Sequence, residues 1–416
     1  MSKSNLILWT LRHRNLKEIA ARFADVAAGW LIRPISFITP RSKDKWLIGN
    51  KTGWCDNSKY LHIYIAEKVG NVRPIWISKS RKERDYVRKK GLEAYRKWSI
   101  KGIYHALTGG AFLFSSNISD INYWASGNAV KINMWHGVGL KKLGMKGSEI
   151  YNPDSLTTRI LTPFFYDAPT LFIGPSDMMA KHFADCYMMR NEQMLKVGYP
   201  RCEFLRKSKR EILNTIHKYE DNEVKKTIGV IEKYNKTYIY MPTFRDAQTD
   251  FLQASHLDFR AIDELLKAKN QLLILKLHPA TRISSESMQD LSNVMELDKN
   301  IDIYPILPFT DVLITDYSSI YYDYLLMPDK NIILFPFDYE DYIKNSRDLA
   351  FDYLTFSPGQ KAWNSNQLMS ILDKEPDLSF PEREWIIEQF WGSQYENACE
   401  KIIEAISNEL GNGFSK

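Results

Sequence analysis

The feature that most constrains the fold is a regular alternation, from residue 45 onward, of short apolar runs with longer mixed segments. Short runs of this kind are typical of buried strands, and the segments between them are long enough to form helices. The first set of expected strands comprises residues 45–49, 74–78, 111–115, 131–135, 170–174 and 195–197. The second set comprises residues 238–241, 272–277, 302–304, 311–315 and 331–335. This alternation predicts parallel sheets with crossover helices, and therefore an α/β protein.

The two sets of strands predict two domains, as does the length of 416 residues. Residues 205–236 separate the sets, are highly charged and lack strand patterns, so they are interpreted as the domain junction. The expected domains are residues 43–204 and 237–380. Residues 381–416 have a helical pattern and are expected to pack back on the first domain.

The N-terminal segment, residues 1–42, has an amphipathic pattern. Its apolar residues recur at helical spacing between Leu16 and Leu31, and Pro34 is expected to stop the helix. An apolar stripe that contains Trp30 and is flanked by Arg and Lys suits a helix lying in a membrane interface. A helix packed on its own domain, or on a second subunit, would have the same pattern.

Basic residues are concentrated in the N-terminal half of the chain. Residues 1–50 carry nine Lys and Arg against three Asp and Glu, and residues 79–101 carry ten against three. This bias favours an anionic partner such as phospholipid or a polyanionic substrate, although a solvated basic face would look the same. No nucleic-acid-binding module accompanies the basic residues, so nucleic acid is not expected as a partner.

Several classes of protein are disfavoured by what the sequence lacks. The four cysteines form no CxxC pair, which argues against a disulfide framework and favours a reducing cytoplasm. No secretory signal and no run of roughly 20 apolar residues is visible, so a soluble body is expected. No HxxxH or HExxH pair is present, and no metal site is expected. Without a P-loop or a GxGxxG fingerprint, ATPase and dinucleotide enzymes lose their usual support.

Two histidines follow expected strands, where active-site residues usually lie in open α/β sheets. His136 comes directly after the first-half strand that ends at Trp135, and Gly137 would let a ligand approach the backbone. His278 follows a second-half strand and precedes Pro279. A lone histidine is more often structural, but two at equivalent positions in the two halves indicate a function.

The second half places further polar residues at strand ends. Arg245 lies just past a strand, where a guanidinium can bind phosphate oxygens. Asp316, Ser318 and Ser319 follow a buried strand and precede an expected helix that begins at Ile320. Free amides and hydroxyls at such a position can bind an anion, although either serine could simply cap the helix.

Together these motifs resemble those of the CDP-glycerol glycerophosphotransferase family, the teichoic-acid primases and polymerases. The resemblance covers about residues 45–372. It rests on Trp135–Lys141 (WHG with a following lysine), Gly198–Arg201 (GYPR), Pro242–Asp246 (PTFRD), Lys276–Pro279 (KLHP), Leu313–Ser319 (LITDYSS), Phe337–Tyr342, Arg347, Phe351–Tyr353 and Pro358-Gly359. The sequence departs from the family's pattern at Cys202-Glu203, Asp348 and Gln360-Lys361.

The resemblance implies a GT-B fold, in which two doubly wound Rossmann-like domains face a cleft. It implies transfer of an alditol phosphate, glycerol phosphate foremost, from CDP-glycerol or CDP-ribitol to a hydroxyl of a lipid-linked or polyanionic polymer, with release of CMP. The product would be a teichoic-acid or capsule-like polymer, made by a peripheral enzyme on the cytoplasmic face of the membrane. No cofactor besides the donor substrate is expected.

The resemblance also implies roles for the candidate residues. His136 is expected to be the general base, with His278 as the second catalytic histidine. The donor phosphates are expected to contact Arg245, Asp316, Ser318, Ser319 and Arg347, and the cleft is expected to be lined by Gly137 and Lys141.

Two other functions remain compatible with parts of this pattern. A GT-B glycosyltransferase would use a nucleotide sugar and release a nucleoside diphosphate, so the leaving group distinguishes it. A non-catalytic scaffold of a polymer-export complex would need no polar residues at the strand ends, and both histidines argue against it.

Overall fold

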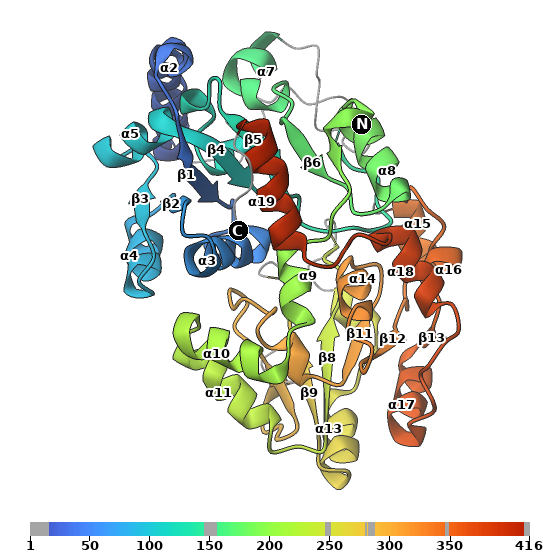
Figure 1. Ribbon diagram of the computed structural model, residues 1–416. Coiled ribbons are helices and arrows are strands. Elements are labelled where there is room, and N and C mark those ends of the chain that lie inside the picture. The colour runs from blue at the N-terminus through green and yellow to red at the C-terminus, as the bar shows by residue number, and fades with distance from the viewer. Residues whose placement is uncertain are drawn as a thin grey trace. The chain divides into compact units, whose positions relative to one another are not determined.

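The chain folds into two compact units, each built on its own parallel sheet (Figure 1). A computed structural model describes residues 16–144, 156–245, 251–278, 281, 288–345 and 349–411. Unit 1 comprises Met1–His136, Leu143–Glu203 and Trp391–Lys416, and unit 2 comprises Gly137–Lys142 and Phe204–Phe390. The expected α/β class with parallel sheets is confirmed.

The sheet of unit 1 has seven parallel strands in the order β3-β2-β1-β4-β5-β6-β7. They are β1 (Ser42–Gly49), β2 (Arg73–Ser78), β3 (Ala94–Arg96), β4 (Gly109–Phe114), β5 (Val130–Asn133), β6 (Leu171–Ile173) and β7 (Met194–Leu195). The chain enters at β1, adds β2 and β3 on one side and then continues from β4 on the other. The strand order therefore reverses between β1 and β4, and ligands of open α/β sheets bind at the carboxyl edge of such a switch point.

Helices precede, connect and follow the strands of unit 1. They are α2 (Leu16–Ile38), α3 (Asp56–Lys68), α4 (Arg81–Lys89), α5 (Ile100–Thr108), α7 (Leu156–Leu161), α8 (Asp177–Tyr187), α9 (Pro200–Leu205) and α19 (Ala398–Glu409), with short 3-10 turns η1 (Ile118–Asp120), η2 (Tyr123–Ala125), η3 (Pro163–Phe165) and η4 (Asn191–Gln193). Helix α19 packs against β5. The C-terminal segment thus returns to the sheet that the N-terminal half of the chain builds.

The sheet of unit 2 has six parallel strands in the order β10-β9-β8-β11-β12-β13. They are β8 (Lys236–Met241), β9 (Gln271–Leu275), β10 (Val294–Glu296), β11 (Val312–Thr315), β12 (Asn331–Leu334) and β13 (Gln360–Lys361). Its helices are α10 (Lys209–Tyr219), α11 (Asn222–Ile231), α12 (Phe251–Ala254), α13 (Phe259–Ala268), η6 (Leu307–Phe309), α14 (Ile320–Leu325), α15 (Tyr339–Asn345), α16 (Tyr353–Phe356), α17 (Ser365–Lys374) and α18 (Arg383–Trp391). Here the order reverses between β8 and β11.

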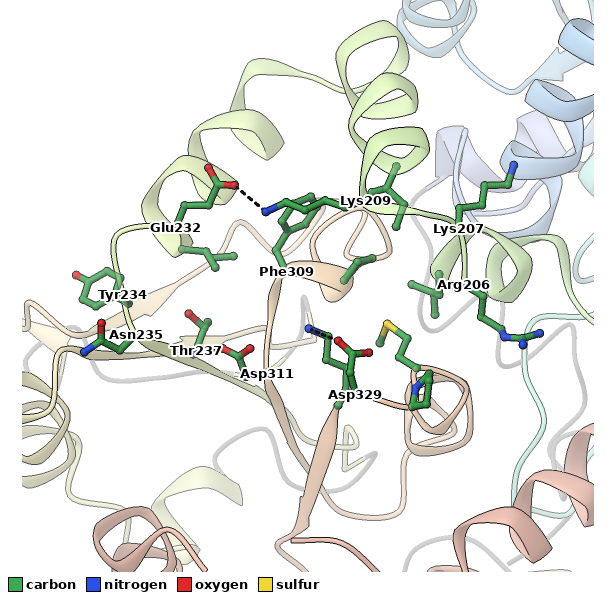
Figure 2. A pocket seen from close by; sticks show the side chains of 17 residues that line it. Arg206, Lys207, Lys209, Glu232, Tyr234, Asn235, Thr237, Phe309, Asp311 and Asp329 are labelled. Carbon is green, nitrogen blue, oxygen red and sulfur yellow. Dashed lines mark hydrogen bonds and ion pairs between the residues drawn. The ribbon is translucent and has the colours of Figure 1, made fainter. Parts of the chain in front are cut away.

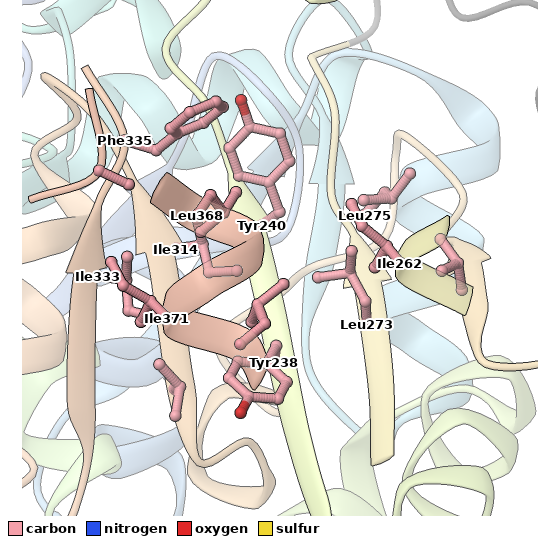
Figure 3. Packing of buried hydrophobic residues seen from close by; sticks show 14 of the residues in the cluster. Tyr238, Tyr240, Ile262, Leu273, Leu275, Ile314, Ile333, Phe335, Leu368 and Ile371 are labelled. Atoms are coloured by element: carbon pink, nitrogen blue, oxygen red, sulfur yellow. The ribbon is translucent and has the colours of Figure 1, made fainter. Parts of the chain in front are cut away.

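The packing of unit 2 explains why its central strands have continuous apolar runs in their sequences. All five residues of β9 are buried, because helices cover the sheet. Figure 3 shows Leu273 and Leu275 of β9 near Ile262 of α13, and Leu368 of α17 packed over the neighbouring strands. Burial of both faces fixes the sheet, and with it the loops at its carboxyl edge.

Two expectations about elements in unit 2 are wrong. Residues 302–304 form no strand, and the outer strand is instead β10, whose three residues pair with β9. Residues 205–236 are also not a separate junction. They form α10 and α11, whose inward residues Ile212, Ile216 and Ile228 are buried within unit 2.

Helix α2 continues through Pro34 to Ile38, so the expectation that Pro34 ends the helix is wrong. Tertiary contacts on both sides of the proline hold it helical. The Arg33 guanidinium donates to the carbonyl of Tyr123 at 2.8 Å, and the Ser36 hydroxyl accepts the amide of Gly127 at 3.1 Å. Within the described ranges, no helix has the length and apolarity that crossing a bilayer requires.

Candidate active site

The first candidate residue, His136, follows β5 in a turn that its neighbours hold in an unusual conformation. Trp135 has a left-handed backbone, with φ of 55°, although it is not glycine. Its amide donates to Asn133 Oδ1 at 2.9 Å, and its carbonyl accepts Nδ2 of Asn57 at 2.8 Å. Strained backbone of this kind persists only where the surroundings hold it, and it is concentrated at functional sites.

The imidazole of His136 is held in one tautomer. Its Nδ1 lies 3.0 Å from the carbonyl oxygen of Ser115, which follows β4. A carbonyl only accepts, so the neutral ring carries its proton on Nδ1 and leaves Nε2 as a proton acceptor. The residue is exposed to solvent, and the desolvation imposed by surrounding protein lowers the pKa of His136, an effect that Asp56 opposes. The ring is thus suited to act as a base at neutral pH.

A buried ion pair between Arg201 and Asp56 holds the backbone of the His136 turn. Nη1 of Arg201 lies 2.6 Å from Asp56 Oδ1 and donates to the carbonyl of His136 at 2.8 Å. The Arg201 side chain is only 4% exposed, so the guanidinium fixes the turn rather than meeting a ligand. Arg201 belongs to the GYPR motif, but the sequence did not indicate its partners. Asp56, Asn57 and Ser115 were missed because their importance depends on contacts across the sheet.

The rest of the GYPR motif is structural. A Cβ at Gly198 would come within 2.2 Å of the carbonyl oxygen of Tyr395, so glycine allows the C-terminal segment to approach. The Tyr199 ring is fully buried and packs edge-on against Trp391 at 5.3 Å. Gly198 and Tyr199 therefore contact the C-terminal segment, next to the arginine that holds the His136 turn within unit 1.

In unit 2, Arg245, expected to be a direct phosphate clamp, is bonded to protein groups on the loops around it. Its Nε and Nη2 form a two-point contact with Asp338 at 2.7 and 2.9 Å, and Nη2 also contacts Asp316 at 2.9 Å. Nη1 donates to the carbonyl of Thr243. The side chain is 3% exposed and four of its five donors are used by these contacts. The two carboxylates outweigh the effect of burial, so the pKa of Arg245 is raised.

Asp316, also expected at the donor phosphate, is likewise bonded to protein groups in this structure. Its carboxylate accepts the amides of Thr243 at 2.9 Å and Tyr317 at 2.6 Å in addition to Arg245. Its side chain is 1% exposed. Arg245, Asp316 and Asp338 therefore join the loops that follow β8, β11 and β12, on both sides of the switch point of this sheet.

Three other candidates, Ser318, Ser319 and His278, follow strands at the same edge of unit 2. Ser318 and Ser319 are half-buried after β11, and the Ser318 hydroxyl accepts only a long contact, 3.4 Å, from the amide of Ile320. Ser319 makes no side-chain capping bond. His278, after β9, is exposed and stacks on Phe244 with ring centroids 4.4 Å apart. Arg347 lies outside the described residues.

The segment Gly137–Lys142 belongs to unit 2, although the chain before and after it belongs to unit 1. Lys141 forms an antiparallel bridge with Leu349, and the amide of Ala350 donates to the Leu140 carbonyl at 2.6 Å. A Cβ on Gly139 would lie 3.4 Å from that of Ser319. Gly139 therefore lies beside Ser319, and Gly137 and Lys141 belong to the same six-residue segment.

A cavity of about 560 Å³ lies away from these residues, at the opposite edge of the unit 2 sheet (Figure 2). It opens between the α10–α11 pair and the amino ends of β8, β11 and β12, marked by Thr237, Asp311 and Lys330. None of the candidate residues lines it. The strand ends, rather than this cavity, mark the site, because substrate sites of such sheets lie at the carboxyl edge. Among the described residues, no group of three or more His, Cys, Asp or Glu could hold a metal ion.

The sequence of this chain is similar to those of two teichoic acid polymerases. The teichoic acid poly(glycerol phosphate) polymerase of Bacillus spizizenii is 24% identical over 362 residues, which are 84% of this chain and 88% of that protein. The teichoic acid poly(ribitol-phosphate) polymerase of the same organism is 28% identical over 296 residues, which are 67% of this chain and 43% of that protein. The chain thus spans less than half of one relative's length and most of the other's.

The fold is also found in a solved structure. The wall teichoic acid polymerase TagF superposes with a TM-score of 0.72 at 20% identity, covering 97% of each chain. The family described as CDP-glycerol:poly(glycerophosphate) glycerophosphotransferase matches residues 36–408, nearly the whole chain. This protein therefore belongs to that family of phosphotransferase enzymes.

Proposed function

We propose that this chain transfers an alditol phosphate, glycerol phosphate foremost, from a CDP-alditol to a hydroxyl of a lipid-linked or polymeric acceptor. CMP would be released, and the product would be a teichoic-acid or capsule-like polymer. The observation that carries the proposal is the fixed tautomer of His136 at the switch-point edge of unit 1, in a chain that matches the glycerophosphotransferase family over residues 36–408.

In the proposed reaction, Nε2 of His136 takes the proton of the acceptor hydroxyl. The acceptor oxygen then attacks the phosphorus that carries the alditol, and the bond from that phosphorus to the CMP oxygen breaks. The Ser115 carbonyl keeps Nδ1 protonated and stabilises the imidazolium that forms. Arg201 acts as a positioning residue, because it binds the backbone of the His136 turn.

On the donor side, we infer that the pyrophosphate binds at the carboxyl edge of unit 2. Ser318 and Ser319 would donate hydroxyl hydrogen bonds, and His278, Lys141 and Arg347 would balance charge on the departing CMP. Arg245 and Asp316 would support this edge by holding its loops together. The proposal needs no cofactor besides the donor, since such a displacement depends mainly on positioning and charge neutralisation.

The donor is tested by incubating the full chain with CDP-glycerol, CDP-ribitol or a UDP-sugar in separate reactions, each with a polymeric acceptor. CMP is expected as the product from at least one CDP-alditol. Release of a nucleoside diphosphate from a nucleotide sugar, without CMP from either CDP-alditol, would establish the glycosyltransferase alternative instead.

The pH dependence of kcat/KM is expected to follow deprotonation of His136. Since its pKa is lowered from 6.5, the ring is neutral and active at pH 7, and activity should fall only in more acidic solution. Below its pKa, kcat/KM should decrease by about tenfold per pH unit. A profile measured from pH 5 to 8 should therefore have its acidic midpoint below 6.5. A midpoint above that value would exclude His136 as the base whose titration controls the rate.

We also propose that α2 holds the enzyme on the cytoplasmic face of the membrane. Its residues Trp30, Leu31, Ile35 and Ile38 are exposed on one helical face, with Leu31 at 75% and Ile38 at 81%. The opposite face is packed, because a Cβ on Gly29 would come within 2.2 Å of the Trp124 ring. An apolar helix face next to basic residues suits an interface rich in anionic lipid.

Vesicle flotation tests this proposal without removing the helix. The double variant Leu31→Glu/Ile38→Glu is expected to lose most binding to phosphatidylglycerol vesicles, since both changes place charge on the exposed face. Leu354→Glu, which makes the same kind of change at an exposed position of unit 2 with 49% exposure, is the control and should float like the unaltered protein. Equal flotation of all three proteins would exclude α2 as the anchor.

A further inference from the structure

Three lysines follow three adjacent strands at the carboxyl edge of the unit 1 sheet. Lys97 comes directly after β3, Lys79 directly after β2, and Lys51 two residues after β1. These strands are neighbours in the order β3-β2-β1-β4-β5, and His136 follows β5 (Figure 1). Neighbouring strands lie about 4.8 Å apart, so the three lysines form a row that leads along the edge toward His136.

Two ammonium groups of this lysine row, those of Lys79 and Lys97, contact neutral oxygens. Nζ of Lys79 donates to the carbonyl of Lys51 at 3.0 Å, and Nζ of Lys97 donates to the carbonyl of Ser119 at 3.0 Å. None of the ion pairs found among the described residues includes a member of the row. Each ammonium has three donors, so the two with known contacts keep donors for a ligand.

One nearby carboxylate, Asp120, is held by the backbone. It is buried, and its Oδ2 accepts the amides of Ser116 at 3.0 Å and Asn117 at 3.1 Å. Burial raises the pKa of Asp120 to about 6 and lowers the pKa of Lys97 to about 8. Asp25 also acts on Lys97, and Glu83 on Lys79, but among the described residues no ion pair joins these carboxylates to the row, so its ammonium groups keep donors for a phosphate.

We propose that the lysine row binds phosphate groups of the acceptor, an alditol-phosphate chain whose terminal hydroxyl lies at His136. This inference rests on the proposed function and names the part of the acceptor that unit 1 recognises. Lys51 and Lys79 are two and three strand spacings from β5, roughly 10 and 14 Å along the edge. The phosphates bound there are thus internal ones, behind the reacting end of the chain.

Membrane phospholipid offers similar phosphate chemistry, but the structure favours the acceptor. The C-terminal half of α2, which carries the exposed apolar face, lies at the amino edge of the sheet. There Nδ2 of Asn128, just before β5, donates to the Phe37 carbonyl at 2.8 Å, and Nη1 of Arg41 contacts the carbonyl of Gly109, where β4 begins, at 2.6 Å. The lysine row lies at the other edge of these strands, with the proposed base.

Direct binding of a fluorescent glycerol-phosphate trimer to the full chain tests the proposal without requiring turnover. The variant Lys51→Gln/Lys79→Gln is expected to bind the trimer about tenfold more weakly or worse, since each lysine contributes a charged hydrogen bond. The control Lys68→Gln/Lys89→Gln removes the same charge from the C-terminal ends of α3 and α4, away from the row. It should bind the trimer normally.

The possible results separate this inference from the proposed function. Weaker trimer binding by Lys51→Gln/Lys79→Gln, with normal binding by the control, supports phosphate binding by the lysine row. This holds even if no CDP-alditol releases CMP. Equal binding by both double variants would overturn it. Unchanged trimer binding combined with reduced flotation on phosphatidylglycerol vesicles would also overturn it, because the row would then bind lipid headgroups. In an active enzyme, the same variant should raise the KM for acceptor but not for donor.

Discussion

His136→Ala is expected to reduce kcat by about 10²- to 10⁴-fold, the usual contribution of a general base. The turn should keep its shape, because Asn57 and Arg201 bind the backbone of Trp135 and His136 rather than the imidazole. CDP-alditol binding should therefore remain close to normal, and the loss should appear in kcat. Single-turnover measurements of CMP release, together with donor binding by calorimetry, distinguish the two effects.

A matched control for this substitution is His217→Ala, which removes an exposed histidine from α10 in unit 2. It should retain full activity. If His136→Ala kept near-normal single-turnover rates, proton transfer would have to involve another group, and the proposed mechanism would fail. A loss confined to the KM for the acceptor would instead indicate that His136 only positions the hydroxyl.

Arg245→Ala is expected to destabilise unit 2 by about 3–5 kcal/mol, the usual cost of removing one partner from a buried ion pair. Asp316 and Asp338 would be left without their cation, in side chains that are 1% and 14% exposed. Arg245→Lys should recover only part of the loss, since an ammonium cannot make the two-point contact with Asp338. Urea unfolding measures the change, and Arg260→Ala, at an exposed position on α13, is the control.

Donor affinity distinguishes support of the loops from direct contact with phosphate. Asp338→Asn releases part of the Arg245 guanidinium and removes a negative charge near the proposed pyrophosphate site. A direct phosphate clamp would then bind CDP more tightly. Because the loops after β8, β11 and β12 are joined through Asp338, weaker binding is expected instead. Tighter binding by Asp338→Asn would restore Arg245 to the role that the sequence suggested.

The buried strands could be predicted from sequence because burial on both faces leaves a clear pattern. The expected run at 272–277 overlaps β9, whose residues are all buried. Short outer strands have no such pattern: β10 and β3 have three residues each, and β13 has two. Residues 302–304 resemble a strand because of Ile303, but that side chain packs in a turn.

Candidate site residues could be located from the sequence, but their partners could not. His136, Ser318 and Ser319 were found because they follow strands. Arg245 follows a strand in the same way, and only the structure shows that its guanidinium is occupied by two carboxylates from other loops. Pairings between loops depend on the strand order, which reverses in the middle of each sheet.

The segment Gly137–Lys142 makes the two units interdependent along the chain. A recombinant fragment that begins at Phe204 and ends at Phe390 would lack the backbone bridge between Lys141 and Leu349 and the chain that lies beside Ser319. Dissecting the enzyme at one linker would therefore yield an incomplete donor half. Chimeras that exchange donor specificity between relatives should carry this hexapeptide with the C-terminal unit.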